Sequence, residues 1–176
     1  MSLTALIQSV TVELDRSDAE SLPVERRIAA LLPPLLAQPD LLAGVDVRFD
    51  PKNYSVTLLH VAPEGRFSVC AIAWMPGQWS RIHDHRAWCA LGVIEGSGAE
   101  EFYRLRTRVT QNGAADPIAE ATGGRALSQG MTSFAAPGPH GVHRIGNPGP
   151  QPMLSLHLYG CNLAECGTSV DHCFDA

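Results

Sequence analysis

Hydrophobic residues follow helical spacing in the first part of the chain. One helix face is formed by Leu3, Leu6, Ile7, Val10 and Leu14. The same spacing continues from Val24 to Leu32, and the Pro33-Pro34 pair is expected to end this second helix. Gly44 then marks the change to a different pattern. We therefore predict a short helical cap over residues 1–44.

After residue 44, hydrophobic and polar residues tend to alternate, which is typical of strands. The predicted strands are Val45–Phe49, Tyr54–Val61, Phe67–Trp74, Trp88–Ile94, Ala99–Leu105, Met131–Ala135, Val142–Ile145, Met153–Tyr159 and Val170–Phe174. Many short strands separated by Gly and Pro predict an all-β sandwich or closed barrel over residues 45–176, because closure removes exposed sheet edges. The stretch Gln111–Gly124 keeps no periodicity, so we expect a solvent loop there.

The composition is typical of one soluble globular domain, and it limits the kinds of partner that we expect. The chain has 176 residues, of which 45% are hydrophobic and 18% charged, and its net charge is −5. It contains no apolar run near the roughly 18 residues of a membrane helix, no export leader and no Lys/Arg block. We therefore expect small-molecule partners, with no nucleic acid and no membrane.

The chain has five cysteines, which is an odd number, and no Cys-x-x-Cys pair. This argues against a disulfide framework and against the usual zinc knuckle, and it favours the reducing cytoplasm. A metal site in this chain would need histidine.

Two of the seven histidines, His83 and His85, flank Asp84. On a strand, residues two apart project from one face about 6.5–7 Å apart, so both imidazoles can converge on one ion while Asp84 points away. Two surface histidines beside an acid are the alternative for this pair taken alone.

The surroundings of the pair resemble the first motif of the cupins. Gly77 precedes His83 by five intervening residues, and Gly96 closes the turn after the next strand. Most cupins carry a glutamate ligand after three further residues, where this chain has Cys89. A resemblance to cupins implies a β-barrel of the double-stranded β-helix or jelly-roll type.

A looser second cupin motif runs from Gly130 through Pro137 to His143 and Asn147. The His-x-x-x-Asn spacing nominates His143, and His140 competes with it from a turn-like Pro/Gly segment. Three neutral imidazoles would leave a divalent ion its full charge and open positions, which suits an anionic substrate such as a thiolate. Imidazole ligation alone permits zinc, copper, nickel or iron.

A third constellation is the segment Leu154-Ser155-Leu156-His157-Leu158-Tyr159. On a strand, the serine, histidine and tyrosine line one face while the leucines pack on the other. Hydroxyl, imidazole and phenol can then relay hydrogen bonds and orient the Tyr159 hydroxyl toward a cavity. The alternative is three buried polar residues that merely satisfy one another.

Together these motifs resemble the cysteine dioxygenase family of thiol dioxygenases over roughly Tyr54 to Phe174. The resemblance implies a cupin barrel, non-haem Fe(II), and oxidation of a small thiol, of the cysteine or 3-mercaptopropionate type, to its sulfinic acid with O2. It implies His83, His85 and His143 as iron ligands. It also implies an outer triad of Ser155, His157 and Tyr159 beside the substrate.

Cys89 occupies the position at which animal members carry a cysteine that forms a thioether with the triad tyrosine, here Tyr159. The neighbouring Arg86-Ala87-Trp88 resembles the bacterial pattern. Two alternatives therefore stand for Cys89, a crosslink or a small buried thiol that fills space.

The substrate carboxylate has no obvious anchor. Leu58 aligns with the arginine that grips it in animal cysteine dioxygenases, and residues 160–176 contain neither Arg nor Lys. Either the substrate lacks a buried carboxylate or the anchor comes from elsewhere. The candidates are Arg48, Lys52, Arg66, Arg81 and Arg86.

We predict an Fe(II) thiol dioxygenase with a cupin-type barrel and a short helical cap. One alternative is another metal-dependent cupin enzyme, an isomerase or a dioxygenase of carbon substrates. A second alternative is a cupin that binds a small molecule without turning it over.

Overall fold

The computed structural model describes residues 2–16, 22–109, 112 and 115–176. Three helices come first: α1 (Leu3–Asp15), α2 (Val24–Ala30) and α3 (Pro33–Leu36). The strands are β1 (Ser55–Val61), β2 (Ser68–Trp74), β3 (Ile82–His85), β4 (Cys89–Glu95), β5 (Ser97–Val109), β6 (Ala115–Ser128), β7 (Thr132–Ala135), β8 (His143–Gly146), β9 (Met153–Tyr159) and β10 (Val170–Phe174). A short turn of 3-10 helix, η1 (Gly138–Gly141), precedes β8, and α4 (Leu163–Cys166) precedes β10. None of the helices in these ranges has the length and apolarity that a membrane crossing requires.

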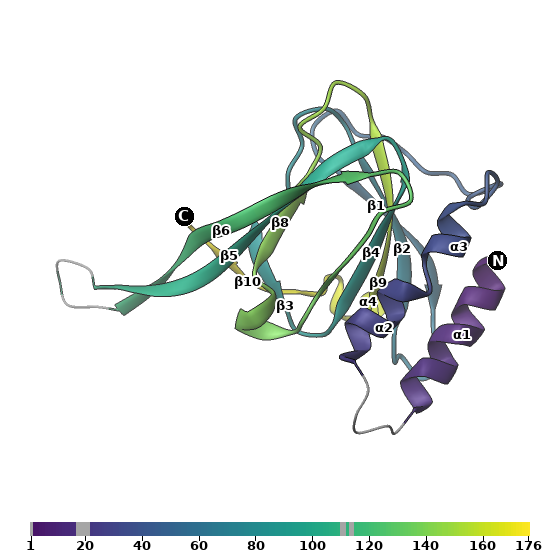
Figure 1. The fold of residues 1–176 in the computed structure, drawn as a ribbon, viewed down its shortest axis with the longest axis horizontal. Coiled ribbons are helices and arrows are strands. Elements are labelled where there is room, and N and C mark those ends of the chain that lie inside the picture. Colours follow the sequence, from purple (N-terminus) through teal and green to yellow (C-terminus); the bar gives the residue numbers. More distant parts are fainter. Residues whose placement is uncertain (1, 17–21, 110–111, 113–114) are drawn as a thin grey trace.

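The strands form two five-stranded antiparallel sheets. Their orders are β1-β2-β9-β4-β7 and β10-β3-β8-β5-β6. The sheets face each other around a common interior, and the three N-terminal helices lie on the outer side of the first sheet (Figure 1). This arrangement confirms the predicted all-β, cupin-type barrel with a helical cap.

The helical cap makes the first sheet buried on both faces. Leu6, Val10 and Ile28 from the helices share one apolar cluster with Leu156 and Leu158 of β9. Every residue of β2 is buried, as expected for a strand covered by helices outside and by the barrel interior inside. The prolines predicted to end the second helix open α3 instead of merely breaking the chain, because proline suits the first turn of a helix.

Alternation along β9 places the predicted polar row inside the barrel. Leu156 and Leu158 pack outward against the helices, whereas Tyr159 belongs to the interior cluster of the barrel. One strand thus supplies both the support for the cap and one wall of the interior.

Two predictions about secondary structure are wrong. Val45–Phe49 belongs to no strand: Val45 and Val47 are only partly buried, and Phe49 is exposed, so the segment has no buried face to fix it in a sheet. Residues 115–124 are not a loop but part of β6, which pairs with β5 in a long hairpin that projects from the barrel (Figure 1). The hairpin is held by backbone pairing with most side chains exposed, so no apolar alternation marks it. Gln111 itself lies outside the described residues.

Candidate active site

The structure brings together three histidines from two strands of the second sheet. His83 and His85 lie on β3, and His143 on β8 is the direct register partner of His83. All three side chains are buried, and their ring centroids lie 4.6–5.2 Å apart. Period-two alternation puts the β3 histidines on the inner face, while Asp84 faces the other way and accepts a hydrogen bond from the backbone N–H of His172.

Each Nδ1 atom of the cluster has an outer partner. His83 Nδ1 donates to the carbonyl of Arg81 at 2.8 Å, and His143 Nδ1 donates to the Glu100 carboxylate at 2.8 Å. His85 Nδ1 lies 2.9 Å from Ser169 Oγ. Protons held at Nδ1 leave the Nε2 lone pairs free, which is the usual arrangement of metal-binding histidine.

The free nitrogens converge and suit a cation. The possible ligand atoms of the three histidines lie within 4.8 Å of one another, and the Nε2 atoms of His85 and His143 are 3.0 Å apart. Two lone pairs facing each other at this distance are unfavourable unless a positive charge lies between them. The donor set therefore fits a divalent metal of the kind that imidazole binds.

Burial favours the neutral form of the two imidazoles on β3, His83 and His85. It lowers the pKa of His83 to about 4 and that of His85 to about 2, and the neighbouring imidazoles act in the same direction. A neutral imidazole is the form that ligates a metal, so His83 and His85 are ready to bind one at neutral pH.

Glu100 is a site residue that the sequence did not reveal. Its carboxylate is fully buried, and besides His143 it accepts hydrogen bonds from Ser133 and Arg125. Burial raises the pKa of Glu100, but these hydrogen bonds and the Arg125 charge outweigh it, so the pKa stays below its ordinary value. In the sequence, Glu100 and Glu101 are adjacent acids on the predicted strand Ala99–Leu105, and neither was identified as a site residue.

The second group in the cavity is the row on β9. Ser155 Oγ lies 2.9 Å from His157 Nε2, and the Tyr159 hydroxyl lies 3.0 Å from His157 Nδ1. Trp74 donates from its indole Nε1 to Ser155 Oγ at 2.9 Å, a contact that sequence reasoning missed because Trp74 reads as an ordinary core residue. Burial lowers the pKa of His157 to about 3 and raises that of Tyr159 well above its usual value.

Cys89 and Tyr159 are direct partners across β4 and β9. Burial raises the pKa of the Cys89 thiol well above its usual value, against the opposing effect of a hydrogen bond from Tyr159. Ser169 links the row to the histidines, because it also hydrogen-bonds Tyr159. Ser169 gave no sequence signal, since it sits in a polar loop.

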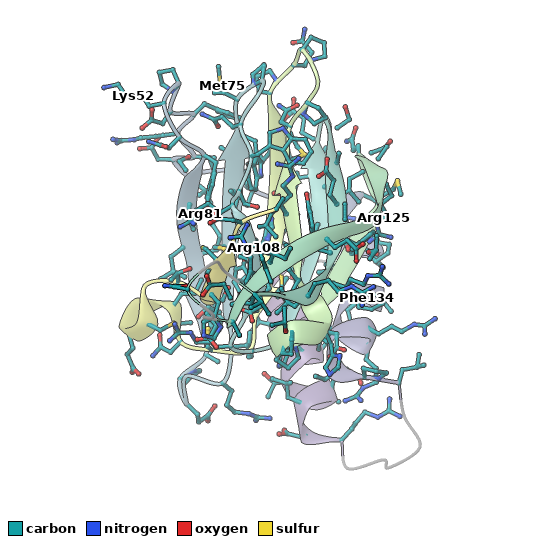
Figure 2. All side chains as sticks on the ribbon, turned by 90° about the vertical axis from the view of Figure 1, so that its left-hand side faces the viewer. Lys52, Met75, Arg81, Arg108, Arg125 and Phe134 are labelled. Carbon is teal, nitrogen blue, oxygen red and sulfur yellow. The ribbon has the colours of Figure 1, made fainter. Side chains whose placement is uncertain are left out.

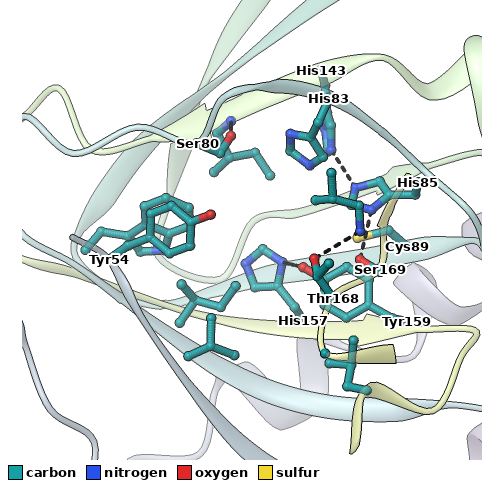
Figure 3. A pocket seen from close by; sticks show the side chains of 17 residues that line it. Tyr54, Ser80, His83, His85, Cys89, His143, His157, Tyr159, Thr168 and Ser169 are labelled. Carbon is teal, nitrogen blue, oxygen red and sulfur yellow. Dashed lines mark hydrogen bonds between the residues drawn. The ribbon is translucent and has the colours of Figure 1, made fainter. Parts of the chain in front are cut away.

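All seven predicted site residues except Ser155 line one cavity of about 80 Å³. Figure 3 shows the three histidines on one side of it, with Tyr159 and His157 below them. Ser155 does not line the cavity and contacts His157 and Trp74. His140, the competitor of His143, is exposed in η1 and does not line this cavity.

Comparison with known proteins gives two kinds of likeness. A protein with a double-stranded β-helix domain from Klebsiella pneumoniae is 22% identical, with a TM-score of 0.47 over 66% of this chain and 84% of that one. An RmlC-like cupin protein from Desulfovibrio desulfuricans is 20% identical, with a TM-score of 0.45 over 70% and 94% of the two chains. Separately, the model of a family described as cysteine dioxygenase type I matches residues 43–171. That match spans the three histidines and the row on β9.

Proposed function

The chain belongs to the cysteine dioxygenase type I family, and on that premise we propose that it is a non-haem iron dioxygenase that oxidises a small thiol to its sulfinic acid. The reaction adds both atoms of O2 to one sulfur, so R–SH and O2 give R–SO2H. Sulfur gives up four electrons and O2 accepts them, so no other reductant is needed.

The observation that carries this proposal is the convergence of three buried imidazoles beside a hydrogen-bonded tyrosine in one cavity. Nε2 of His83, His85 and His143 would hold the metal, and ferrous iron supplies the redox centre at which thiol and O2 react. The three imidazoles bring no negative charge, so open positions favour an anionic ligand such as a thiolate.

The hydrogen-bonding network fixes where the Tyr159 proton points. The Trp74 indole can only donate, so Ser155 Oγ accepts from it. The Ser155 hydroxyl then donates to His157 at 2.9 Å in preference to the Ile72 carbonyl at 3.4 Å. His157 in turn carries its proton at Nδ1 and donates to the tyrosine oxygen.

Ser169 completes the network at the tyrosine. It accepts from Nδ1 of His85 and donates to the Tyr159 oxygen. With both of its acceptor positions filled, the Tyr159 hydroxyl directs its own hydrogen toward Cys89 and the cavity. There it can hydrogen-bond the reacting sulfur or oxygen at the buried end of the cavity.

The test is anaerobic loading of the whole chain with Fe(II), followed by thiol addition under 18O2. We expect thiol-dependent O2 uptake and a sulfinate with two labelled oxygens by mass spectrometry. His83→Ala should lose iron, whereas Tyr159→Phe should keep iron and slow or uncouple turnover. His140→Ala, which alters an exposed histidine, is the matched control.

Three results would contradict the proposal. Stoichiometric iron in His83→Ala would overturn the ligand assignment. Tightly held zinc or nickel with no O2 uptake would favour another metal-dependent cupin enzyme. Saturable thiol binding without sulfinate would favour a binding module.

A further inference from the structure

The cavity continues away from the histidines between apolar side chains. Its wall includes Val56, Ile72, Ile145 and Leu163. Tyr54 lies on the far side of the cavity from His85 and Tyr159, and its hydroxyl points inward (Figure 3). A thiol whose sulfur reached the histidines would place its other end in this neutral region.

No cation lines that region. All 13 Lys and Arg residues of the chain lie within the described ranges, and none is among the lining residues. Three of the five sequence candidates pair with acids on the exterior: Arg48 with Asp46, Arg66 with Asp15 and Arg86 with Asp171. The other two, Lys52 and Arg81, have exposed side chains, and Figure 2 shows Lys52 at the same end of the barrel as Met75.

The head-group region therefore offers hydroxyls instead of charge. Ser80 Oγ accepts from the backbone N–H of Ile145, and Thr168 Oγ1 accepts from that of Val170. The Tyr54 hydroxyl makes no hydrogen bond to any described residue, and its ring is held 4.5 Å from the Trp74 ring. Tyr54 is 36% exposed, so it is a polar group at the mouth of the cavity whose donor and acceptor no described residue uses.

We infer that the site takes a short thiol whose other end is uncharged, such as an amide, an ester or an alcohol, and that Tyr54 is the hydrogen-bonding anchor of that end. The inference rests on the proposed function and narrows its substrate class. Beside the buried side chains of Ile72 and Ile145, a carboxylate would lose water without gaining a cation, whereas a neutral polar group needs only a hydroxyl partner. The volume of about 80 Å³ limits the substrate to a short chain.

The experiment compares thiols that share a three-carbon chain and differ in the group at its end: 3-mercaptopropionate, its methyl ester and its amide, with 1-propanethiol as the member that lacks a polar end. Sulfinate formation by the Fe(II) protein gives kcat/KM. Binding to the Co(II)-substituted protein, followed by the thiolate charge-transfer band, gives Kd without turnover. We expect the ester and the amide to be favoured at least tenfold over the acid in both measurements.

Two substitutions test which residues cause the preference for the ester and the amide over the acid. Tyr54→Phe should weaken the amide and ester about fivefold, the usual effect of one lost hydrogen bond, and leave 1-propanethiol unchanged. Val56→Arg places a guanidinium at the mouth beside Tyr54 and should improve the acid at least tenfold. Val12→Arg, at a similarly exposed valine on α1, is the control that should change neither.

The outcomes distinguish a failure of this inference from a failure of the proposed function. A preference for the acid would overturn the inference, and loss of that preference in Arg81→Gln would show that exposed Arg81 supplies the anchor. If no thiol yields sulfinate, the proposed function fails, while the Co(II) binding series still tests the neutral head group.

Discussion

The Glu100 carboxylate accepts a hydrogen bond from Nδ1 of His143 at 2.8 Å, with both side chains buried. Arg125 approaches the same carboxylate at 3.0 Å from the partly exposed side. A buried negative charge thus orients one histidine of the cluster and is itself compensated by a guanidinium. Such outer partners fix the ring and raise the basicity of the ligating nitrogen.

We predict that Glu100→Gln lowers metal affinity about 10- to 100-fold, because the amide keeps the shape but removes the charge that supports His143. Competition with a chelator, read as bound metal per chain, measures the effect. Glu101→Gln is the matched control, since its neighbouring carboxylate pairs with Arg144 away from the cluster. Equal affinities in the two variants would show that Glu100 does not support the site.

Trp74 is predicted to be a positioning residue for Tyr159. Trp74→Phe removes the donor to Ser155, so the serine hydroxyl can reorient and the direction of the hydrogen bonds through His157 is no longer fixed. We expect unchanged metal content and several-fold less sulfinate per O2 consumed. A Ser155→Ala protein should show little further loss from Trp74→Phe; additive losses would point to a packing defect instead.

The sequence was most informative where the two faces of a strand have different surroundings, one apolar and one polar. Alternation in β9 predicted both the row of Ser155, His157 and Tyr159 and the outward leucines. It failed for β6, whose side chains are mostly exposed, so backbone pairing leaves no hydrophobic signature.

The sequence also did not reveal the residues that hydrogen-bond the histidines of the cluster, and the reason is different. Glu100 and Ser169 act through contacts with residues 43 and 84 positions away. Only the three-dimensional register of β5 with β8, and the return of the chain before β10, brings them to the histidines. No local pattern encodes such distances.

The metal-free protein should lose stability as the pH falls below about 6.5. The unfolded chain binds protons at its histidines near that value, whereas burial lowers the folded pKa of His83 to about 4, of His157 to about 3 and of His85 to about 2. Stability is therefore fully present above pH 6.5 and declines toward the folded pKa values. Each imidazole contributes up to about 1.4 kcal/mol per pH unit.

Urea unfolding of the metal-free chain at pH 7.5 and 5.5 measures this decline, and we expect a loss of about 2–4 kcal/mol in the free energy of unfolding. His157→Gln should reduce the loss by about a third, because one of three titrating groups is gone. His140→Gln, at an exposed position, should not change it. Equal stability at the two pH values would mean that the buried histidines are already protonated or solvated.

The last prediction concerns the close approach of Gly146 to Trp79, which pair across an isolated bridge. A Cβ at Gly146 would overlap the indole ring, so the ring and the loop leading into β3 must shift. Gly146→Ala is expected to lower the free energy of unfolding by about 1–3 kcal/mol and to weaken metal binding, because that loop carries the Arg81 carbonyl that holds His83. At Gly149 the nearest atom to a new Cβ is 3.4 Å away, an ordinary contact, so Gly149→Ala is the control. If both variants unfold at the same urea concentration and bind metal equally, the position of the loop does not depend on this glycine.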